Sequence, residues 1–157
     1  MKIIRTTLLA LISWNADLVC QHQQHDEEAI ETGFYFIDDE ETDIKLKYAY
    51  RNQSYFVKPS PILKTSDFER IELREETWPG LKWTHSLTIW LNDEGRDKWE
   101  KATTKAMKER SEIAFVLEDE IVTVLGVHMP MTNGVASIFG ENLSKEALIT
   151  IKEKLEK

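Results

Sequence analysis

Several short segments of the chain alternate apolar and polar residues, which is the pattern of a β-strand with one buried face. The clearest is 44–50, in which four apolar side chains alternate with two lysines and an alanine. Other short runs rich in β-branched and aromatic residues lie at 33–37, 54–58, 68–74, 87–91, 113–117, 121–125 and 135–139. The acidic residues 118–120 separate two of these runs and predict a hairpin turn.

Two longer segments have apolar residues at helical spacing. The segment Asp93–Arg110 is expected to begin with Asp93 as its N-cap and to bury one face, formed by Trp99, Ala102, Thr103, Ala106 and Met107. The basic residues near its end suit the negative end of the helix dipole: Lys105, Lys108 and Arg110. The segment Ser144–Lys157 is expected to begin with a serine cap and to bury Ala147, Leu148, Ile151 and Leu155.

The order of these elements is a group of strands, a helix, a hairpin, a strand and a helix. Strand groups followed by helices favour an α+β fold over a doubly wound one. We therefore predict a two-layer sandwich, in which one mostly antiparallel sheet has both helices packed on one face. Segment 44–50 is predicted to be an edge strand of this sheet, available to pair with an extended peptide.

The first twenty residues resemble an export signal. A small basic region precedes a short apolar run at 6–13, and Cys20 follows, as in a bacterial lipoprotein signal whose cysteine is lipidated. Asp17 and Val19 depart from the usual residues before such a cysteine.

We predict a leader at 1–19, a polar tether at 20–30 and a single domain at 31–157. The protein would then be exported, either periplasmic or anchored as a lipoprotein. The alternative is a cytoplasmic protein in which the first segment is partly buried and Cys20 is an inert core thiol.

Composition narrows the classes of partner. The chain has 157 residues and a formal net charge of −8. Proteins that bind nucleic acids gain much of their affinity from positive charge facing phosphates, and no Lys/Arg cluster stands out, so we expect no nucleic-acid partner. No run of apolar residues after the first twenty positions is long enough to span a bilayer, so membrane contact is expected only through a lipid on Cys20. A lone cysteine cannot form an internal disulfide.

No motif indicates an enzyme. His85 and His128 have no serine or cysteine nucleophile at a known motif spacing, and the chain contains neither a Walker loop nor a G-x-G-x-x-G sequence. His22 and His25 could join a metal site, but structural zinc normally needs four ligands, and a solvated tether explains both histidines. We expect no catalytic residue, no cofactor and no metal.

Trp78 and Trp83 are candidate contacts for a partner. They lie in a loop-like segment, and tryptophan is enriched at interface hot spots. The alternative is that both side chains pack in the core.

The chain also resembles a known family over about residues 54–157, most strongly over 84–157. Leu91-Asn92-Asp93-Glu94-Gly95, Met131-Thr132-Asn133-Gly134 and Ser144-Lys145-Glu146-Ala147 are similar, in the same order, to motifs of the head subdomain in the first periplasmic region of SecD, a subunit of the protein-export translocase. Upstream, the segment from Tyr55 to Phe68 resembles a further stretch of that family.

The resemblance implies a protein-binding module that contacts unfolded or partly folded polypeptide outside the cytoplasm. The transmembrane helices of SecD have no counterpart in this sequence, so the resemblance does not imply proton-driven translocation. One alternative is an accessory or inhibitory protein with one dedicated folded partner. A third hypothesis is an enzyme without a recognisable motif.

Overall fold

The computed structural model describes residues 29–38, 44–77, 80 and 84–157. The strands in these ranges are β1 (Gly33–Asp38), β2 (Ile44–Tyr48), β3 (Ser54–Val57), β4 (Leu63–Lys64), β5 (Phe68–Glu75), β6 (His85–Leu91), β7 (Glu112–Leu117), β8 (Glu120–Gly126) and β9 (Val135–Ile138). The helices are α1 (Asp93–Glu109), α2 (Lys145–Leu155) and a short 3₁₀ helix, η1 (Thr65–Asp67). Both predicted α-helices and the predicted hairpin are therefore confirmed.

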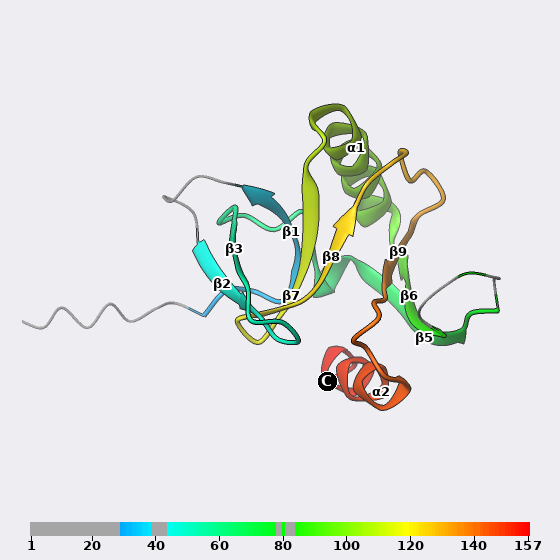
Figure 1. Cartoon of the computed structure of the whole chain (residues 1–157). Helices are drawn as coiled ribbons and strands as arrows, with labels where there is room; N and C mark the ends of the chain where they lie inside the picture. The colour runs from blue at the N-terminus through cyan, green and yellow to red at the C-terminus, as the bar shows by residue number, and fades with distance from the viewer. Residues whose placement is uncertain (1–28, 39–43, 78–79, 81–83) are drawn as a thin grey trace, which may run out of the picture.

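Six strands form a sheet that closes on itself. Their order is β3-β2-β8-β7-β1-β4, and β3 also pairs with β1, so five of them make a small barrel (Figure 1). Apart from the parallel pair β2–β8, the strand pairs of the described residues are antiparallel. Because β2 is bonded to β3 on one side and β8 on the other, the prediction that 44–50 is a free edge strand is wrong. Alternation in a sequence shows that one face is buried, but not how many neighbours a strand has.

The remaining strands form a second, antiparallel sheet in the order β5-β6-β9. The α+β class is thus confirmed, but the predicted two-layer sandwich with a single sheet is wrong, because the strands are divided between this sheet and the barrel. The two helices nonetheless pack against the same strand, since both contact β6.

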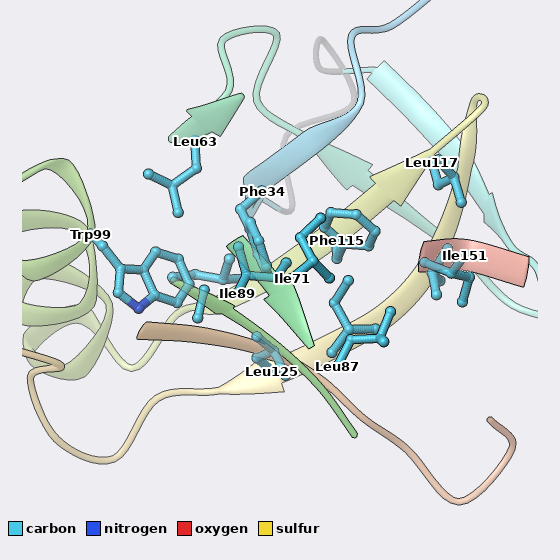
Figure 2. Packing of buried hydrophobic residues seen from close by; sticks show 14 of the residues in the cluster. Phe34, Leu63, Ile71, Leu87, Ile89, Trp99, Phe115, Leu117, Leu125 and Ile151 are labelled. Atoms are coloured by element: carbon cyan, nitrogen blue, oxygen red, sulfur yellow. The ribbon is translucent and has the colours of Figure 1, made fainter. Parts of the chain in front are cut away.

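The main core lies where the barrel, the second sheet and both helices meet. Phe34 of β1 packs against Trp99 of α1 and Phe115 of β7, with ring centroids 5.0 Å and 4.8 Å apart. Leu87 and Ile151 bring β6 and α2 to the same cluster (Figure 2). A second, smaller cluster fills the barrel and contains Tyr35, Leu46, Tyr48, Val57, Ala114, Val116 and Ile121.

The helix caps differ in part from expectation. Asn92, rather than Asp93, caps α1, since its Oδ1 accepts a hydrogen bond from the backbone N–H of Gly95 at 2.8 Å. Asp93 is the first helical residue, where a carboxylate suits the positive end of the dipole. The predicted cap of the last helix is confirmed: Ser144 Oγ accepts from the N–H of Ala147 at 3.2 Å.

Candidate functional site

A groove of about 980 Å³ runs along α1. Its lining residues come from 36–38, 58–62 and 98–112, which are the end of β1, the β3–β4 connection, and α1 with the start of β7. We call it the α1 groove. The fold creates it by bringing together three segments that lie far apart in the sequence.

The β3–β4 connection forms one wall because prolines lift it away from β1. The N–H groups of Lys58 and Ile62 donate to the carbonyl oxygens of Phe36 and Phe34, at 3.0 Å and 2.7 Å. Between these bonds, Pro59 and Pro61 have no N–H to donate, so the chain cannot continue a regular ladder there. This wall presents the apolar side chains of Phe36, Ile37, Pro61 and Ile62.

The opposite wall is basic. Lys98, Lys101 and Lys105 follow one another at spacings of three and four residues, which places them on one face of α1. In all, the lining contains five cations and three carboxylates: Lys58, Lys98, Lys101, Lys105 and Arg110, with Asp38, Glu109 and Glu112. The groove is therefore locally positive in a chain whose net charge is −8.

Lys98 is engaged by neighbouring carboxylates. Its Nζ lies 2.8 Å from Glu94 Oε1 and 2.9 Å from Oδ1 of the buried Asp67. The hydrogen bonds to Glu94, and next those to Asp67, raise the pKa of Lys98. This lysine connects η1 to the first turns of α1.

The other cations of this wall are freer. Lys105 Nζ lies 5.0 Å from the ring centroid of Phe36 and 3.9 Å from Glu109 Oε2, so it bridges the two walls only loosely. Among the described residues, neither Lys101 nor Arg110 has a carboxylate oxygen within 4.0 Å. Arg110 lies at the end of α1 in a left-handed conformation, with φ of 55°.

A second feature is the outer face of the β5-β6-β9 sheet. The guanidinium carbons of Arg70 and Arg74 lie 3.8 Å and 4.8 Å from the ring centroid of Trp90. Arg70 also pairs with Glu72 at 2.8 Å. This partly exposed cation–π cluster combines the residue types that dominate interface energetics.

The sites predicted from the sequence fall elsewhere. Cys20, Trp78, Trp83, His22 and His25 lie outside the described residues. His85 begins β6, with Nδ1 2.9 Å from Thr84 Oγ1, and His128 is exposed after β8; neither lines the α1 groove.

Within the described ranges, no group of three or more His, Cys, Asp or Glu residues could hold a metal ion. No helix in the same ranges is long and apolar enough to cross a membrane. Sequence reasoning missed the α1 groove, although the regular spacing of Lys98, Lys101, Lys105 and Lys108 was a signal for one basic helix face.

A comparison with known protein families shows which family this chain belongs to. Residues 42–149 match the family described as "SecDF, P1 head subdomain". The chain belongs to this family. The match contains most of the region in which the sequence motifs resembled the SecD head, so that resemblance is confirmed.

Two solved structures are similar to this chain. The first, "Structure and function of a membrane component SecDF that enhances protein export", has a TM-score of 0.58 and 17% identity, covering 80% of this chain and 62% of that one. The second, "Crystal structure of SecDF in Super-membrane-facing form", has a TM-score of 0.49 and 20% identity, covering 59% of this chain and 12% of that one. This chain therefore spans less than two thirds of either structure. No curated protein matches.

Proposed function

We propose that this protein is a non-enzymatic, extracytoplasmic module that binds unfolded or partly folded polypeptide, and that the α1 groove receives the bound segment. The observation that carries the proposal is membership of the SecDF P1 head family over residues 42–149. The structure titled as a membrane component that enhances protein export supports a role beside exported chains.

The groove suits this function physically. An extended polypeptide needs a concave surface with apolar contacts and a few polar partners, and the α1 groove supplies Phe36 and Ile62 opposite a wall of lysines. Extended chains lose conformational entropy when they become ordered on binding, so we expect weak and broad recognition.

The test compares one destabilised reporter protein in its unfolded and folded forms. Fluorescence anisotropy of the labelled reporter is measured against increasing concentrations of the full chain. We expect saturable binding of the unfolded form alone. Equal binding of both forms, or of neither, contradicts the proposal.

The export signal and lipid anchor form a separate part of the proposal. Mass spectrometry of the protein from its native cell gives the mature N-terminus. We expect loss of residues 1–19, and a diacylglyceryl group on Cys20 if the chain is a lipoprotein. An intact Met1 overturns the extracytoplasmic assignment.

A second candidate function is that of an accessory or inhibitory protein with one folded partner. The Arg70–Trp90–Arg74 cluster favours it, since tryptophan and arginine are the commonest hot-spot residues. A pull-down that recovers one folded protein stoichiometrically, and loses it when Trp90 is changed to alanine, would select this function over polypeptide binding.

A further inference from the structure

The two walls of the α1 groove differ in chemistry. One presents Phe36, Pro61 and Ile62, and the other presents Lys101 and Arg110, which have no carboxylate oxygen within 4.0 Å among the described residues. A ligand between these walls gains most if one of its sides is apolar and the other is anionic. The carboxylates of Asp38, Glu109 and Glu112, which also line the groove, offset only part of the positive charge of its five cations.

The dimensions match an extended chain. The positions from Lys98 to Arg110 span about 18 Å along the helix axis, which is the length of about five extended residues. Lys101 and Lys105 are one helical turn apart, so their side chains leave the helix about 6 Å from each other. Alternate side chains on one edge of an extended peptide are spaced by about 7 Å.

From this match we infer that the α1 groove selects extended polypeptide segments in which acidic and apolar residues alternate. The carboxylates face Lys101, Lys105 and Arg110, and the apolar side chains face Ile62 and Phe36. Lys105 Nζ, which lies 5.0 Å from the ring centroid of Phe36, turns from that ring to a carboxylate of the ligand. The inference rests on the proposed function and adds the class of polypeptide that the site prefers.

Shape favours a peptide over a membrane surface as the occupant. The lysines line the groove together with apolar residues that come from β1 and the β3–β4 connection, so a ligand in the groove meets both kinds of side chain. A planar array of lipid headgroups could reach the rim but not fill the space between the walls.

The test uses three labelled octapeptides with the full chain. One alternates leucine and glutamate, and in the others glutamine or lysine replaces every glutamate. We expect the glutamate peptide to bind about tenfold more tightly than the glutamine peptide, and the lysine peptide to bind more weakly still. The preference should shrink as salt rises from about 50 mM to about 500 mM, because exposed charges are screened.

Substitutions locate the site. Lys101→Glu should weaken binding of the glutamate peptide about fivefold and leave the glutamine peptide nearly unchanged; Arg110→Gln should act in the same direction. The matched control is Lys145→Glu, which makes the same change of net charge on an exposed position of α2 outside the groove. A photo-crosslinking residue at Ser60, on the rim, should capture the peptide, and one at the exposed Ile149 should not.

The possible outcomes distinguish a failure of the charge preference from a failure of the proposed polypeptide binding. If the glutamate and glutamine peptides bind equally and crosslink at position 60, the groove binds polypeptide but the charge preference is wrong. If no peptide and no unfolded reporter binds, the proposed function fails as well. Binding to vesicles of anionic phospholipid that needs Lys101, with no peptide binding, overturns the inference in favour of a membrane surface.

Discussion

The indole N–H of Trp99 donates a hydrogen bond of 3.0 Å to the backbone carbonyl oxygen of Val135. Trp99 is fully buried, and its ring also packs against Phe34 of the barrel. This one side chain therefore connects α1 with the first strand of the barrel and the last strand of the second sheet.

Changing Trp99 to phenylalanine should destabilise the fold by about 2 kcal/mol, because it removes the hydrogen bond to Val135 and leaves part of the indole space empty. Urea unfolding followed by circular dichroism measures the loss. The matched control is Trp90→Phe on the outer sheet face, where the cost should stay below about 1 kcal/mol because phenylalanine keeps the cation–π contacts. Equal losses at both positions would contradict this account.

Thr103 connects α1 to the segment before β9. Its hydroxyl donates to the carbonyl oxygen of Trp99 at 2.8 Å and accepts from the backbone N–H of Met131 at 2.9 Å. Thr103→Val keeps the shape but leaves the Met131 N–H without its acceptor, so we expect a loss of about 1–3 kcal/mol in the free energy of unfolding. Thr104→Val on the same helix should cost much less. A neutral Thr103→Val variant would mean that water replaces the hydroxyl.

Gly33 allows β4 to approach β1. It pairs with Lys64, and a Cβ at this position would lie 2.1 Å from the carbonyl oxygen of Leu63. Gly33→Ala must therefore push β4 away, and we expect a loss of at least about 3 kcal/mol in stability. Gly126→Ala is the control, because its nearest contact would be an ordinary 3.7 Å. Comparable unfolding midpoints for the two variants would disprove the close approach.

Tyr35 should make the protein sensitive to alkali. Burial, and next the charge of Glu31, raise the pKa of Tyr35 from 10.0 to about 12. An unfolded tyrosine loses its proton at lower pH than the folded one. The contribution of protonated Tyr35 to the free energy of unfolding is therefore complete below pH 10 and is lost as the pH rises to 12.

Phenylalanine at position 35 cannot ionise. At the upper end of this pH interval, the free energy of unfolding of Tyr35→Phe should therefore have fallen by about 2 kcal/mol less than that of the unaltered chain. Urea unfolding at several pH values gives the two slopes, and the comparison of slopes excludes the constant loss of the hydrogen bond to the Glu31 carbonyl oxygen. Parallel slopes for Tyr35→Phe and the unaltered chain would refute the prediction.

Local patterns predicted the individual elements well. The spacing of Trp99, Ala102, Thr103 and Ala106 located the buried face of α1, since helical period and burial are both local properties. The cap was misplaced by one residue, because Asn92 and Asp93 are both good caps and only the backbone decides which one is extended.

Long-range pairing could not be predicted in this way. The closure of the barrel depends on Ile37 and Asp38 pairing with Val57 and Phe56, and nothing in the alternation of β1 or β3 specifies that partner. The α1 groove was missed for the same reason, since Phe36 and Lys105 are distant in sequence and meet only in the folded structure.

Closure of the barrel also limits where foreign chains could attach. In the described part of the molecule, the pairing of β3 with β1 leaves β4, β5 and β9 as the outermost strands. β4 and β9 are only two and four residues long, and the longer β5 carries the charges of Glu69, Arg70, Glu72, Arg74 and Glu75. Short or charged edge strands resist intermolecular sheet growth, so the described part of this fold offers foreign chains few backbone groups on which a fibril could extend.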